Sequence, residues 1–251
     1  MEFFDANVTI GRPRNAQLFE PVPDADQLCA RMHQAGIAKA LVSHWGQSDG
    51  SPLSTNALVD EAVSASRSLF GCWAVLPPLT DPLVDGDFFN SMQAAGAVAV
   101  CMLPTSHRYV LAPVVWGSFL DELCARRVPV MFDMSSEVGW ADLYSFLREV
   151  SSLTCVLRNI GTWSMDRYTY PLLDAYANVY LETSMLSIED GGVEGVVQRF
   201  GAERLLFGTG FPVRYAEASM LQLIHADITG DQRRAIASGN LERLVAGAAY
   251  E

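Results

Sequence analysis

Three ionisable residues stand at the ends of short apolar segments. His44 follows ALVS, Asp133 ends VPVMFD, and Glu182 lies near the end of NVYLET. A charge at the end of a buried segment is costly unless it has a partner. Converging carboxylates and an imidazole can transfer protons as acid and base, and two close carboxylates push one pKa upward. We predict Asp133, Glu182 and His44 as catalytic residues. The structural alternative stays open: a satisfied histidine, and salt bridges to Arg158, Arg108 or Arg214.

Neutral, cationic and aromatic side chains stand near the ends of other apolar segments. An arginine beside a tyrosine in a loop suits an anionic or aromatic ligand, although an exposed polar loop explains the same pattern. Two asparagines in this set can hydrogen-bond each other or water. The predicted substrate-binding residues are Asn7, Thr9, His107, Arg108, Tyr109, Asn159, Trp163 and Arg214.

The segments that must position these residues form a repeating pattern. Eight short apolar runs are spaced about thirty residues apart, the length of one strand-helix unit. Most runs are continuously apolar, as in parallel strands that are covered on both faces. The predicted strands are 2–7, 38–43, 70–76, 97–103, 128–133, 154–159, 178–183 and 204–209.

Amphipathic stretches separate the runs. Helices are predicted over 24–36, 114–127, 137–150 and 192–200, and one or two more close the chain over 231–251. We predict an α/β fold, a (β/α)8 TIM barrel with extra C-terminal helices, as a single domain over 1–251. A doubly wound open sheet is the alternative. It normally carries a Gly-rich phosphate turn after the first strand, and ANVTIGRPRN is not such a turn.

Composition narrows the classes of partner. The 251 residues are 50% hydrophobic with a net charge of −12, which argues against nucleic acid and anionic membranes as partners. No apolar stretch approaches the ~20 residues of a membrane-spanning helix, and no signal peptide is visible. The five cysteines are odd in number, widely spaced and without a CxxC pair, which favours reduced thiols and a cytoplasmic location.

Six segments carry a resemblance to the amidohydrolase superfamily, in the branch of amidohydrolase-related barrels that includes lactonases and nonoxidative decarboxylases. FFDANVTIG is similar to the opening D-A-H-x-H-x-G, and AGIAKALVSH and VLRNIG fit the second and sixth strands. ANVYLETS resembles N-V-Y-x-D-x-S, and RFGAERLLFGTGFP resembles G-x-D-R-L-L-F-G-S-D-x-P. GNLERLV matches the closing G-N-A-x-R-L. The resemblance runs along most of the chain and implies the barrel fold.

The resemblance also implies where a divalent metal would be bound. The family uses two His on the first strand, a His on each of the fifth and sixth, and an Asp on the eighth that is also the general base. The matching positions hold Asn7, Thr9, Asp133, Asn159 and Gly210. Amide, hydroxyl and glycine are poor ligands for a zinc-type ion. We therefore predict a divergent member that lacks the metal centre and uses no cofactor.

Three functions remain open. The first is a metal-independent hydrolase or decarboxylase-like enzyme that acts on a small polar or carboxylated molecule. The second is a non-catalytic ligand-binding or scaffold protein, a pseudoenzyme of the same lineage. The third is a hydrolase with a relocated metal, held by Asp133, Glu182 and either His44 or His107. The expected partner is a small-molecule ligand, and the family resemblance suggests a homodimer.

Overall fold

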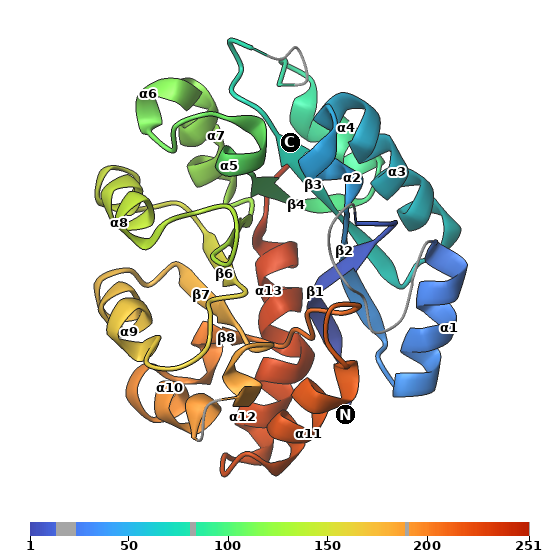
Figure 1. The fold of residues 1–251 in the computed structure, drawn as a ribbon, viewed down its shortest axis with the longest axis vertical. Helices are drawn as coiled ribbons and strands as arrows, with labels where there is room; N and C mark the ends of the chain where they lie inside the picture. The colour runs from blue at the N-terminus through green and yellow to red at the C-terminus, as the bar shows by residue number, and fades with distance from the viewer. Residues whose placement is uncertain (14–23, 81–83, 189–190, 251) are drawn as a thin grey trace.

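The computed structural model describes residues 1–13, 24–80, 84–188 and 191–250 and shows a barrel of eight parallel strands in chain order (Figure 1). The strands are β1 Phe4–Ile10, β2 Lys39–His44, β3 Leu69–Val75, β4 Ala97–Met102, β5 Val130–Asp133, β6 Cys155–Arg158, β7 Val179–Glu182 and β8 Leu205–Leu206. The backbone N–H of Ala6 donates to the Phe207 carbonyl at 2.8 Å, and that of Gly210 donates to the Asn7 carbonyl at 3.0 Å. These bonds bring the first strand against the segment after the last, and the predicted (β/α)8 fold is confirmed.

The last strand is shorter than predicted. Residues 204–209 were expected as a strand, but β8 ends at Leu206. The next residue, Phe207, donates its N–H to the Ile236 carbonyl at 3.0 Å, in the C-terminal segment. The chain after β8 therefore divides its hydrogen bonds between β1 and the C-terminal helices, which shortens the regular ladder.

Helices surround the barrel on its outer side (Figure 1). They are α1 Ala25–Ala35, α2 Gly46–Asp49, α3 Pro52–Ala65, α4 Phe88–Ala94, α5 Pro104–His107, α6 Pro113–Trp116, α7 Ser118–Arg126, α8 Trp140–Glu149, α9 Asp166–Ala175, α10 Gly192–Phe200, α11 Ala216–His225, α12 Gly230–Arg234 and α13 Asn240–Gly247. Short 3-10 turns lie at η1 Leu186–Ile188 and η2 Ala202–Arg204, and η3 Ala235–Gly239 is a π-helical turn.

Local sequence signals explain where several helices begin and end. The Asp24 side chain accepts the N–H of Gln27 at 2.9 Å and caps α1, which ends at Gly36 with φ of 81°. The helix predicted over 114–127 is divided, because Gly117 adopts φ 57° and ψ −140° between α6 and α7. The predicted closing helices are present as α12, η3 and α13.

Two layers of apolar side chains fill the molecule. Alternate strand residues point into the barrel, among them Ala6, Leu41, Met131, Val156 and Leu206. The other strand residues pack against the outer helices. Leu241 of α13 joins the inner set, so this helix closes the end of the barrel where the strands begin. All five cysteines are free, and no helix of the described residues is long and apolar enough to cross a membrane.

The side chain of Asn240 attaches α13 to η2 and to the start of β8, and replacing it tests how much this attachment stabilises the fold. It is fully buried, and its Nδ2 donates to the carbonyls of Ala202 and Leu205, each at 2.7 Å. Asn240→Ala leaves both buried carbonyls without these donors, so we expect the free energy of unfolding to fall by about 2–4 kcal/mol in urea titrations. Glu242→Ala on the same helix removes only a partly exposed ion pair with Lys39. This variant should change the free energy of unfolding by less than about 1 kcal/mol. Equal losses in the two variants would contradict this account.

Candidate active site

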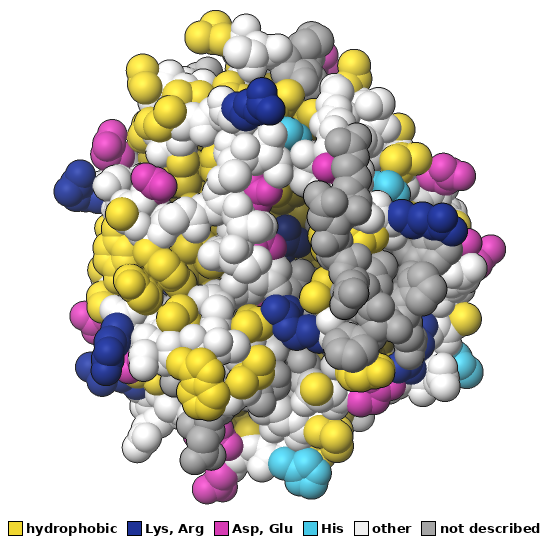
Figure 2. Space-filling model, viewed as in Figure 1, with side chains coloured by type: hydrophobic (Ala, Val, Ile, Leu, Met, Phe, Trp, Pro, Cys, Tyr) yellow, Lys and Arg dark blue, Asp and Glu magenta, His cyan; other side chains and the backbone are white. Residues whose placement is uncertain are grey.

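A cavity of about 280 Å³ opens at the end of the barrel where the strands finish, the end that carries active sites in this fold. In the space-filling view a hollow lies at the centre of this face, with basic and acidic side chains visible inside it (Figure 2). The cavity is lined by Asn7, Thr9, Ser43, His44, Trp45, Gln47, Ser48, Cys101, Leu103, Asp133, Ser135, Ser136, Glu137, Arg158, Asn159, Gly210, Phe211, Val213 and Arg214.

The strand pleat selects which polar residues face this cavity. Asp133, Arg158 and Glu182 each come two residues after an inward apolar residue of β5, β6 or β7 and therefore point inward as well. Strand β1 reaches the cavity differently. Its pairing with β2 shifts register between Asp5 and Val8, and beyond this irregularity it is Asn7 and Thr9 that line the cavity.

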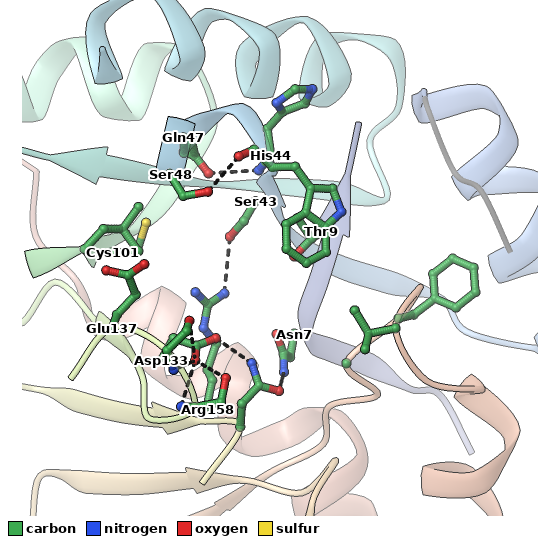
Figure 3. A pocket seen from close by; sticks show the side chains of 18 of the residues that line it. Asn7, Thr9, Ser43, His44, Gln47, Ser48, Cys101, Asp133, Glu137 and Arg158 are labelled. Carbon is green, nitrogen blue, oxygen red and sulfur yellow. Dashed lines mark hydrogen bonds between the residues drawn. The ribbon is translucent and has the colours of Figure 1, made fainter. Parts of the chain in front are cut away.

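Asn159 lies at the centre of a row of hydrogen bonds, and two of its partners, Asn7 and Asp133, are labelled in the close view (Figure 3). Its Oδ1 accepts from Asn7 Nδ2 at 3.2 Å and from Arg214 Nη1 at 3.0 Å, and its Nδ2 donates to Asp133 Oδ2 at 2.6 Å. The backbone of Asn159 has φ of 51°, in the left-handed region that asparagine tolerates better than most residues. Of the two partners that the sequence left open for Asn7 and Asn159, each other or water, the structure shows the bond to each other.

Asp133 is oriented by the turn that follows β5. Its Oδ1 accepts from the Ser135 N–H at 2.9 Å, the Ser135 hydroxyl at 2.6 Å and the Ser136 N–H at 3.2 Å. Its Oδ2 accepts from Asn159, and a lone pair remains on that oxygen. The carboxylate is thus fixed in direction while one oxygen stays available to a ligand.

Glu182 lies beneath this row and has no exposed surface. Its Oε2 accepts from Asn7 Nδ2 and from the Ser184 hydroxyl, both at 2.9 Å, and its Oε1 accepts the Ser184 N–H. Burial raises the pKa of Glu182, and the bonds from Ser184 and Asn7 oppose that rise. A Cβ at residue 208 would lie 2.3 Å from Glu182 Oε1, so Gly208 is required for the carboxylate to fit.

Arg214 occupies the space beside Gly210. A Cβ on Gly210 would lie 2.4 Å from Arg214 Nη1, and the glycine itself has φ of 68°. Within the described part of the chain, neither Asp133 nor Glu182 forms an ion pair with Arg158, Arg108 or Arg214. The two carboxylates are held by neutral donors instead of the salt bridges that the structural alternative would need.

His44 turns away from the carboxylates. Its Nδ1 accepts the Gly46 N–H at 2.9 Å, and its ring covers Gly11, where a Cβ would lie 2.4 Å from Nε2. In the close view the imidazole points away from Asp133 (Figure 3). Burial lowers the pKa of His44. Of the three residues predicted as catalytic, Asp133 faces the cavity, Glu182 lies below its floor, and the imidazole of His44 is directed elsewhere.

The predicted substrate-binding residues divide into two groups. Asn7, Thr9, Asn159 and Arg214 line the cavity. The others lie outside it: His107 Nε2 contacts the Gln47 carbonyl at 2.8 Å, Tyr109 packs on Trp116 with ring centroids 5.3 Å apart, and Trp163 is 69% exposed. Arg108 and Tyr109 line a neighbouring cavity of about 420 Å³.

Many lining residues were not in the predicted set, among them Ser43, Gln47, Cys101, Glu137 and Arg158. Glu137 accepts from the Ser106 hydroxyl at 2.5 Å and the Ser106 N–H at 3.0 Å. Arg158 was considered only as a partner for a carboxylate. The signal that finds it is the strand pleat, because Arg158 has the same parity as the inward Val156.

The donors at the positions that the resemblance assigns to metal ligands do not fit a zinc-type ion. Asn7 and Asn159 offer amides, Thr9 a hydroxyl, Asp133 one carboxylate, and Gly210 no side chain. Among the described residues no group of three His, Cys, Asp or Glu side chains could hold a metal. The side chain next to Gly210 is a guanidinium, which repels a cation.

Comparison with solved structures shows the same fold at low identity. A 2,6-dihydroxybenzoate decarboxylase from Rhizobium is 14% identical with a TM-score of 0.75, over 98% of each chain. A putative 2-pyrone-4,6-dicarboxylic acid hydrolase from Pseudomonas putida is 16% identical with a TM-score of 0.73, over 98% of this chain and 97% of that one. An uncharacterized TIM-barrel protein from Bordetella bronchiseptica is 16% identical with a TM-score of 0.73, over 98% of this chain and 99% of that one. No family model and no curated protein matches the chain.

Asp5 makes the stability of the barrel depend on pH. It is buried and accepts from the Thr209 hydroxyl at 2.6 Å and from the N–H groups of Thr209 and Asn7, each at 3.0 Å, as expected for a structural residue. Burial raises the pKa of Asp5 from 3.8 to about 7. Between these values the folded protein binds more protons than the unfolded chain. The free energy of unfolding therefore falls as pH rises through this interval, by about 4 kcal/mol from this residue.

We expect Asp5→Asn to remove most of that fall, since the amide does not titrate. Urea titrations at a series of pH values should show the variant gaining stability relative to the wild type between about pH 4 and pH 7. Asp26→Asn, at an exposed position of α1, is the control and should keep the wild-type pH dependence. Parallel pH curves for Asp5→Asn and the wild type would show that Asp5 titrates normally.

Proposed function

We propose that the chain is a metal-independent enzyme, of hydrolase or decarboxylase-like type, that acts on a small polar or carboxylated molecule in the cavity. The observation that carries the proposal is the row of hydrogen bonds that joins Asp133, Asn159, Asn7 and Arg214 at the strand ends. It presents one oriented carboxylate and one guanidinium to the same space. The likeness of the fold to decarboxylases and hydrolases supports the same reaction class. We also propose that the chain is a divergent member of the amidohydrolase superfamily.

Asp133 is the proposed proton-transfer group. In a hydrolysis its free Oδ2 lone pair would take a proton from the attacking water and return it to the leaving group. In a decarboxylation Asp133 would deliver a proton taken up from solvent to the carbon that loses carbon dioxide, and that carbon would keep the electron pair of the broken bond. Arg214, held by Asn159, would stabilise the negative charge that develops in either reaction.

The other two ionisable candidates take different roles in this proposal. Glu182 touches Asn7 but has no exposed surface, so it positions the row from below. His44 lines the cavity, but its imidazole lies against Gly11 and Gly46, so this proposal gives it no part in proton transfer. Asn7 and Asn159 keep the carboxylate and the guanidinium apart, which prevents Asp133 and Arg214 from neutralising each other.

A non-catalytic ligand-binding protein is the second candidate. It is favoured by the imidazole of His44, which is directed away from Asp133 and leaves the carboxylate without a second proton carrier beside it. A relocated metal is not supported, because the described residues offer no cluster of ligands for one.

Asp133→Asn tests the proposal against both alternatives. Protein treated with a chelator would be assayed with 2,6-dihydroxybenzoate for carbon dioxide release and with 2-pyrone-4,6-dicarboxylate for ring opening, after elemental analysis for divalent metals. We expect turnover of one of these compounds or a close analogue without metal, and a loss of about 10²- to 10⁴-fold in kcat/KM in Asp133→Asn. Asp121→Asn, at an exposed position of α7, should retain full activity.

The remaining outcomes separate the candidates. One equivalent of bound metal, with activity lost on chelation, would refute metal independence. Ligand binding without turnover of any compound would leave the non-catalytic candidate in its place.

A further inference from the structure

Arg158 carries a buried positive charge that no carboxylate of the described residues contacts directly. Its side chain is 6% exposed, and its Nη1 donates to the Ser43 hydroxyl at 3.2 Å. Its Nε is buried and makes no hydrogen bond. No ion pair joins Arg158 to the carboxylates of the described residues. A buried guanidinium in this state is costly, so a group that is bound only during function is expected to complete it.

The geometry places this charge at the floor of the cavity. Arg158 comes from β6 and reaches across toward Ser43 of β2, while Asp133 and Asn7 lie to either side (Figure 3). Burial opposes the charge on the guanidinium, yet the groups around it hold the pKa of Arg158 above its ordinary range; these groups are Cys72, Cys101, Asp133 and Glu182. The residue therefore stays cationic in the cavity.

We propose that Arg158 is the receptor for a carboxylate group of the ligand, a role distinct from that of Arg214 at the strand-8 side of the cavity. This inference rests on the proposed function only in placing the ligand in the same cavity. The ligand carboxylate would accept hydrogen bonds from the Arg158 guanidinium and from the Ser43 hydroxyl. The hydroxyl would rotate so that its proton points toward the carboxylate. The rest of the ligand would then extend toward Asp133 and Arg214.

The charges and size of the cavity define the class of ligand further. Its lining carries two arginines, Arg158 and Arg214, and two acids, Asp133 and Glu137. A monoanion adds one charge to this balanced set, whereas a dianion such as phosphate would meet repulsion from both acids. A volume of about 280 Å³ lies just below the usual range of ligand sites, roughly 300–1,000 Å³. The site therefore fits a compound of about one ring that carries a carboxylate group.

A competing source of negative charge lies next to the guanidinium. Cys72 and Cys101 are buried on the neighbouring strands β3 and β4, and Cys101 lines the cavity. A hydrogen bond with Cys101 lowers the pKa of Cys72 against the effect of burial, and the charge of Arg158 lowers it further. If Cys72 were a thiolate in the resting protein, Arg158 would already have its counter-ion.

The test compares benzoate with benzamide, its neutral analogue of the same shape, by calorimetric titration of the whole protein. We expect benzoate to bind at least about tenfold more tightly than benzamide and than inorganic phosphate. Arg158→Met should weaken benzoate binding about 10- to 100-fold, and Arg158→Lys should lose less. Arg148→Met, on the exposed face of α8, is the control and should bind benzoate as the wild type does. Equal affinities for benzoate and benzamide would overturn the proposal.

A second measurement keeps the test valid if Arg158→Met does not fold. Ser43→Ala removes the hydroxyl that contacts Arg158 Nη1 and that would donate to the same carboxylate. We expect this variant to bind benzoate about tenfold more weakly and to bind benzamide as the wild type does. Unchanged benzoate affinity in Ser43→Ala would count against the proposed site. Ultraviolet absorbance of a thiolate at neutral pH that disappears in Cys72→Ser would also overturn it, because the counter-ion would then be Cys72.

A failure of the proposed carboxylate site can be distinguished from a failure of the proposed enzymatic function. Benzoate binding that depends on Arg158, in a protein without turnover, supports this site and removes only the catalytic proposal. Turnover with unchanged KM in Arg158→Met keeps the enzyme and removes only this site.

Discussion

The side-chain amide of Asn159 connects three segments at the mouth of the barrel. It joins Asn7 of β1, Asp133 of β5 and Arg214 after β8, and it does so as both acceptor and donor. An amide suits this position because it can bond a carboxylate on one side and a guanidinium on the other without carrying charge. Glu182 supports the arrangement from below through Asn7. The geometry of the cavity depends on this one neutral group, because a charged residue there would attract one neighbour and repel the other.

The fold could be predicted from the sequence because its signals are repeated. Eight apolar runs at even spacing define the strands, and the errors fall where a local device intervenes. Gly117 divides one predicted helix into two, and the bonds of Phe207 to the C-terminal segment shorten the last strand. Neither is visible in a pattern of apolar residues, because each depends on a backbone conformation or on a distant partner.

The site was harder to predict than the fold. Sequence position shows which residues lie at a strand end, but it does not show in which direction their side chains point. His44 is the last residue of β2, one residue beyond the expected strand end, yet its ring lies on Gly11 and Gly46, since both glycines leave room for it. Arg158 lies inside an apolar run and was considered only as a salt-bridge partner, although strand parity places it inward. Asp133 and Asn159 were found from their place at strand ends and from the family resemblance, and both line the cavity.

The space beside Gly210 limits how this chain can change. A side chain at this position would meet the Arg214 guanidinium and would also have to adopt a left-handed backbone. An aspartate introduced there would pair with the arginine before it could serve any other purpose. A side chain at residue 210 therefore needs a change at residue 214 as well, because it would occupy space that the Arg214 guanidinium now fills.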